Sequence, residues 1–129
     1  MKTPGKYGTI FIADISGFSA FVKKMPSRRG ADIISGFLEE IIRANMLSLD
    51  ISEIEGDAIL FYKIGQVIEI ALIRAQFELM LRAFNRKKHL LLQSCPEVAE
   101  LSIKVIVNYG LISTLSVGTY KKRDRDRYQ

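Results

Sequence analysis

The dipeptide Gly56-Asp57 and the apolar run Ala-Ile-Leu-Phe-Tyr that follows it constrain the fold of this 129-residue chain more than any other feature. Residues 49–55 and 58–62 have strand character, and a tight link of glycine and aspartate between two such runs is a hairpin signal. Because residues 58–62 show no polar alternation, they predict a central strand that is covered on both faces. We therefore expect an antiparallel pair at the centre of a sheet.

The remaining apolar patterns predict further strands and three helices around this hairpin. Residues 7–13 form a compact run that is typical of a buried strand, and residues 101–109 alternate with strand period. A short helix is expected over residues 17–25 with Ser16 as its cap, a second helix over residues 32–47, and a long helix over residues 67–84. Gly110 allows a turn into a last strand over residues 111–117.

This order of elements predicts the fold class. Strand, helices, strand, strand, helix and strand is the order of a ferredoxin-like α+β sandwich, with an antiparallel sheet of four or five strands and the helices packed on one face. The length and the 48% share of hydrophobic residues suit one packed domain. We expect this domain to span residues 1–118, and residues 119–129 to form a basic, disordered tail.

Charge and cysteine content argue against several classes of function. The net charge is +5, but +3 of it lies in the last nine residues, whereas nucleic-acid binding needs basic charge gathered on one face. Cys95 is the only cysteine, which excludes an internal disulfide and a zinc cluster and fits a reducing compartment. Charged residues interrupt residues 67–84, so no membrane span is predicted. We expect a cytoplasmic protein without a signal peptide.

Two aspartates are the strongest candidates for chemistry. Asp14 follows the first strand and Asp57 lies at the hairpin tip, and the predicted topology can bring these points together at one edge of the sheet. Two close carboxylates repel each other unless a proton or a cation lies between them, and such oxygen ligands suit Mg²⁺ or Mn²⁺. The alternative is structural, with Asp14 capping the next helix and Asp57 serving the turn. The spacing alone leaves both interpretations open.

The residues around both aspartates resemble the metal-binding motifs of class III nucleotidyl cyclases. Residues 11–19, Phe-Ile-Ala-Asp-Ile-Ser-Gly-Phe-Ser, are similar to the first motif, and residues 53–58, Glu-Ile-Glu-Gly-Asp-Ala, are similar to the second. Residues 103–110 resemble a later strand of that family, which ends in glycine. The resemblance covers about residues 7–112 and is nearest to bacterial cyclase-homology domains of unknown function.

The resemblance implies a set of site residues. Asp14, Asp57 and the backbone carbonyl of Ile15 would hold Mg²⁺ or Mn²⁺. The nucleotide would be bound by the turn after the first strand, whose N–H groups face a triphosphate at a helix start, and by one hairpin residue: Ser16, Gly17, Phe18, Ser19 and Glu53. Glu53 occupies the position at which cyclases select the base, where glutamate accompanies guanine. Glu55 departs from the family, which mostly carries an apolar residue there.

The resemblance also implies a homodimer, because class III cyclases form their sites between two such domains. Those cyclases use an asparagine and an arginine on a late helix, and no Asn-x-x-x-Arg pattern follows Gly110 in this sequence. We therefore expect a degenerate cyclase-like domain that binds a divalent metal and a nucleoside triphosphate without efficient turnover, and we assign no catalytic residue. Two alternatives stay open: an active cyclase that forms a cyclic nucleotide, and a non-enzymatic interaction or dimerisation domain.

Overall fold

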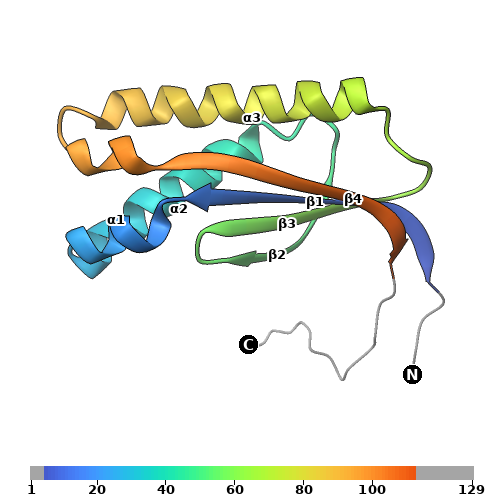
Figure 1. Cartoon of the computed structure of the whole chain (residues 1–129), viewed down its shortest axis with the longest axis horizontal. Helices are drawn as coiled ribbons and strands as arrows, with labels where there is room; N and C mark the ends of the chain where they lie inside the picture. Colours follow the sequence, from blue (N-terminus) through green and yellow to red (C-terminus); the bar gives the residue numbers. More distant parts are fainter. Residues whose placement is uncertain (1–4, 113–129) are drawn as a thin grey trace.

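The computed structural model describes residues 5–112, which form a sheet with helices on one side (Figure 1). The elements follow one another as β1 (Lys6–Ser16), α1 (Phe18–Lys24), α2 (Ser27–Arg43), β2 (Asp50–Glu55), β3 (Ala58–Ile64), α3 (Ile70–Leu91), the short 3₁₀ helix η1 (Pro96–Glu100) and β4 (Ser102–Ile112). None of the helices in this part of the chain combines the length and the hydropathy that crossing a bilayer requires.

The four strands form one antiparallel sheet in the order β2-β3-β1-β4. β1 lies inside the sheet, paired with β4 over its whole length and with β3 as far as Asp14, which is opposite Ala58. This is the strand order of a ferredoxin-like α+β fold, so the predicted fold class is confirmed, with four strands in the described residues. The expected tail over residues 119–129 lies outside them.

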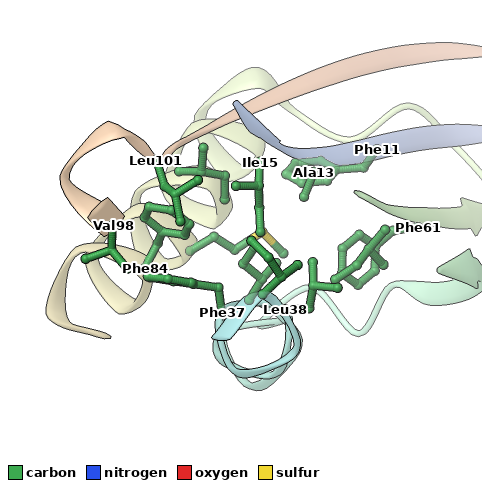
Figure 2. Close-up of a cluster of buried hydrophobic side chains, with 14 of the residues drawn as sticks. Phe11, Ala13, Ile15, Phe37, Leu38, Phe61, Phe84, Val98 and Leu101 are labelled. Carbon is green, nitrogen blue, oxygen red and sulfur yellow. The ribbon is translucent and has the colours of Figure 1, made fainter. Parts of the chain in front are cut away.

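Successive side chains of β1 lie on opposite faces of the sheet. Phe11, Ala13 and Ile15 are buried in a core that includes α2 and α3 residues, and Figure 2 shows this cluster. The rings of Phe37 from α2 and Phe84 from α3 stack there, with centroids 4.5 Å apart. We call the other face, which carries the half-buried β1 residues 10, 12 and 14, the open face, because no described helix covers it.

The helices differ in their boundaries from the sequence expectation. α2 begins at Ser27 instead of residue 32, directly after Pro26, which occupies the N-cap position. This start is physically reasonable, because proline at a helix start gives up no intrahelical hydrogen bond. α3 spans Ile70–Leu91 instead of residues 67–84, so the basic residues Arg86, Lys87 and Lys88 lie within the helix and not after its end.

Two strand expectations are also corrected. Gly110 does not turn the chain: it continues β4 opposite Gly8, and only Leu111 and Ile112 of the expected last strand fall within the described residues. β3 is central but is not covered on both faces. Its residues Ile59 and Phe61 are buried, whereas alternate residues of the strand are only half-buried on the open face. A strand without polar residues can thus have one face buried in the core and the other face uncovered.

Thr9 offers a test of the packing. It is 2% exposed in β1, and among the described residues its Oγ1 has no hydrogen-bond partner. A buried hydroxyl without a partner costs about 1–3 kcal/mol of desolvation. We expect Thr9→Val, which removes the hydroxyl and keeps the shape, to raise the free energy of unfolding by about 1 kcal/mol in urea denaturation. Thr9→Ser keeps the hydroxyl and serves as the control. A Thr9→Val protein that unfolds at lower urea would contradict this packing.

Candidate metal and nucleotide site

The end of β1 and the β2–β3 hairpin bring the two predicted metal aspartates into neighbouring positions. The backbone N–H of Ile15 donates a hydrogen bond of 2.8 Å to the carbonyl of Asp57, and Asp14 lies opposite Ala58. Gly56 adopts φ 48°, a left-handed conformation that lets the two-residue turn close. The hairpin tip is therefore fixed against the strand that carries Asp14.

The carboxylate of Asp14 meets a cation on the open face. Lys104 of β4 is its cross-strand partner, and Lys104 Nζ lies 3.7 Å from Asp14 Oδ2. The two side chains are 59% and 29% exposed, and an ion pair at such exposure contributes about 0–1 kcal/mol. This ion pair therefore adds little to the stability of the fold. Sequence reasoning missed Lys104, because alternation assigns a residue to a strand but does not reveal which residue it faces.

The turn after β1 is held by the segment that precedes β4. Ser16 is the last residue of β1, and Gly17 adopts φ 86°. A Cβ at Gly17 would lie 2.4 Å from the carbonyl oxygen of Glu100, so only glycine fits. Gly17 and not Ser16 is the N-cap of α1, and no side chain caps that helix, so the expected Ser16 cap is wrong. Phe18 is half-buried and Ser19 is exposed.

A hollow of about 300 Å³ lies on the open face beside Asp14. Two carboxylates from β2 and three apolar side chains line it: Glu53, Glu55, Ile12, Ala58 and Leu60. Ala58 lies between Glu55 and Asp14 in the register of the sheet, so the hollow adjoins the aspartate. A concave apolar surface with a few polar groups is typical of small-molecule sites. The residue predicted to select the base, Glu53, therefore shares one face of the sheet with Asp14.

A second cavity connects the turn with the hairpin. Phe18, the first residue of α1, and Gly56 at the hairpin tip both line a cavity of about 520 Å³ that extends along α2. The turn after β1 and the tip of the β2–β3 hairpin, which are separated by about 40 residues in the sequence, therefore approach the same region of the molecule.

The donor set suits a cation that takes few ligands from the protein. Within residues 5–112, no group of three or more Asp, Glu, His or Cys side chains is arranged to hold a metal ion. Mg²⁺ commonly keeps several waters and is bound by one or two carboxylates together with substrate phosphates. The carboxylates of Asp14 and Asp57 match Mg²⁺ or Mn²⁺ in ligand type and in number.

The fold is that of class III nucleotidyl cyclase domains. The guanylyl cyclase Cya2 matches with a TM-score of 0.75 at 17% identity, over 95% of this chain and 63% of that chain. The adenylyl cyclase CyaB from P. aeruginosa matches with a TM-score of 0.70 at 16% identity, over 88% of this chain and 60% of that chain. A class III adenylyl cyclase-like ATP-binding protein from Pseudomonas aeruginosa matches with a TM-score of 0.70 at 15% identity, over 84% of this chain and 26% of that chain. At these identities the likeness shows a shared fold, and this chain spans less than two thirds of each relative.

The sequence itself assigns the family. A family model described as a protein of unknown function (DUF2652) matches residues 34–124, and the chain belongs to this family. The matched segment contains the hairpin with Asp57 and the strand with Lys104. No curated protein matches the sequence.

Proposed function

We propose that the chain is a degenerate nucleotidyl cyclase-like domain that binds Mg²⁺ or Mn²⁺ and a nucleoside triphosphate without efficient turnover. The observation that carries the proposal is the hydrogen bond from the Ile15 N–H to the Asp57 carbonyl, because it holds the hairpin against the strand of Asp14. The cyclase-like fold supports the same assignment, and one protein of that fold is described as ATP-binding.

In this proposal the metal ion offsets an acidic surface. Asp14, Asp57 and the Ile15 carbonyl are the metal ligands, and the acidic residues of the hairpin lie nearby. A triphosphate is repelled by these carboxylates unless cations accompany it. The nucleotide residues are those of the turn and of the hollow on the open face: Ser16, Gly17, Phe18, Ser19 and Glu53. Nucleotide binding should therefore depend on a divalent metal, and Glu53 favours GTP over ATP.

The site is tested by calorimetric titration of GTP and ATP in the presence of Mn²⁺. We expect the wild-type chain to bind GTP, and Asp14→Asn/Asp57→Asn to lower the affinity at least about 100-fold, because two charge-assisted contacts are lost. Asp32→Asn/Asp50→Asn removes the same charge from α2 and β2 and is the matched control, with binding expected to stay within about threefold. Omitting Mn²⁺ should abolish the heat in all variants.

The other outcomes separate the alternatives. Equal affinities in the two double mutants would contradict the metal site. No heat with either nucleotide would favour the non-enzymatic interaction domain. Formation of a cyclic nucleotide by the wild-type chain, and its loss in Asp57→Asn, would establish the active cyclase and contradict the degenerate domain.

We also propose that the chain forms a homodimer through the open face. Ile106 is 56% exposed in the middle of β4, and Ile12 and Leu60 follow it across the sheet in register. Apolar side chains that adjoin in this way on a surface are typical of association sites. The row therefore marks the centre of the proposed interface. Ile12 and Leu60 also line the hollow on the open face, so the two proposals together place the nucleotide at the border between the two copies.

Ile106→Asp tests this interface. We expect the wild-type chain to sediment as a dimer and Ile106→Asp to sediment as a monomer, because a carboxylate would lose its hydration at the centre of the contact. Leu90→Asp is the matched control, since Leu90 is even more exposed but lies on α3. A wild-type monomer, or an Ile106→Asp dimer of unchanged affinity, would contradict the interface.

A further inference from the structure

A hollow of about 390 Å³ lies where the C-terminal end of α2 meets α3. Leu79 and Ala83 of α3 and Ala44 after α2 provide its apolar surface, and Arg43 and Arg86 border it. Its volume lies within the range of about 300–1,000 Å³ that is usual for small-molecule sites. None of the residues proposed for metal or nucleotide binding lines it.

One wall of this hollow is held rigidly by a buried amide. Gln76 is fully buried; its Oε1 accepts hydrogen bonds from the N–H groups of Met46 and Leu47, both 2.9 Å, and its Nε2 donates to the carbonyl of Ala44 over 2.7 Å. The side chain of Asn45 exchanges two further hydrogen bonds with the backbone of Leu49. The segment after α2 is therefore preformed and need not be ordered by a ligand.

The border of the hollow carries a net positive charge. Arg43 donates a hydrogen bond of 2.8 Å to Glu40, which offsets one cation. Arg86 has no carboxylate within ion-pair distance among residues 5–112. The C-terminal end of α2 is the negative end of its dipole and disfavours an anion, so the attraction comes from the two arginines. An anion at this border can therefore be bound through the arginine guanidinium groups.

We propose that this hollow binds a small amphipathic organic anion. Its carboxylate, sulfonate or phosphate group contacts Arg86 and Arg43, and its aromatic or aliphatic body lies on Leu79 and Ala83. Charge complementarity selects the head group, and apolar burial against the α3 side chains retains the body. The inference does not depend on the proposed metal and nucleotide site, because the two share no residue.

The test uses the fluorescent anion 8-anilinonaphthalene-1-sulfonate with the full chain. We expect saturable binding of one molecule per chain, and an affinity lowered about tenfold in Arg86→Gln, because one charge-assisted contact is lost. Arg82→Gln is the matched control, since Arg82 is an exposed arginine of the same helix that does not line the hollow. Octanoate should compete with the probe, and the neutral analogue N-phenyl-1-naphthylamine should bind more weakly.

Three results would overturn the proposal. These are the absence of saturable binding, an equal loss of affinity in Arg82→Gln and Arg86→Gln, and tighter binding of the neutral analogue. Thermal unfolding of each variant shows whether it is folded. Arg43→Gln provides a second test from the other side of the hollow, and there too the proposal requires a weaker affinity for the sulfonate.

Discussion

Gly17→Ala is expected to lower the free energy of unfolding by about 2–4 kcal/mol. Two separate costs contribute. Gly17 has φ 86°, which an L side chain adopts only with strain, and a Cβ there would lie 2.4 Å from the Glu100 carbonyl oxygen. The clashing atom of Glu100 is a backbone oxygen in the segment before β4, so the clash cannot be relieved by rotating a side chain. The substitution should displace the turn that follows Asp14.

The matched control is Gly56→Ala. Gly56 also has positive φ, at 48°, but a Cβ there would meet no heavy atom within 4 Å. Its cost should therefore be only the conformational one, about 1 kcal/mol. Urea denaturation of both variants gives the comparison. Equal losses would show that the close approach of Gly17 to Glu100 is not an energetic constraint.

Phe84→Ala is expected to lower the free energy of unfolding by about 3–5 kcal/mol. Phe84 is fully buried in α3, and its ring stacks on Phe37 of α2 at the contact between the two long helices. Removing it deletes the apolar burial of an aromatic side chain and leaves a cavity that the sheet above and α2 below can fill only in part.

Leu90→Ala provides the control on the same helix. Leu90 is 72% exposed, so its truncation should change the free energy of unfolding by no more than about 0.5 kcal/mol. Guanidinium denaturation gives the free energy of unfolding of both variants, and the comparison applies where their m-values agree. A loss below about 1 kcal/mol for Phe84→Ala would be inconsistent with the packing of α3 on α2 described above.

The hairpin and the neighbourhood of its aspartate were predictable from the sequence because both depend on local signals. Gly56-Asp57 between two strand-like runs specifies an antiparallel turn, and the Cα register places Asp14 opposite the residue after Asp57. Strand order followed from the order of elements. What the sequence did not reveal about β1 is its length. Pairing with β4 extends the strand through Asp14 to Ser16, past the polar residues that suggested its end.

Contacts between distant segments could not be predicted from a single sequence. Gly17 approaches Glu100, and Lys104 pairs with Asp14, although about 80–90 residues separate the members of each pair. Gln76 is a polar residue within an apolar helical segment, and it is fully buried because its amide bonds the backbone after α2. Tertiary contacts decide such positions, and local propensity carries no information about them.

The most direct test of the proposed metal and nucleotide site is to find where in the chain Mn²⁺ binds. In the ¹⁵N-labelled chain with GTP present, substoichiometric Mn²⁺ broadens the amide signals of residues near the ion. The proposed site predicts selective broadening at Asp14, Ile15 and Asp57, with the signals of α3 unchanged, and loss of the effect in Asp14→Asn/Asp57→Asn. Broadening confined to another part of the chain, or its persistence in the double mutant, would contradict a metal site between β1 and the β2–β3 hairpin.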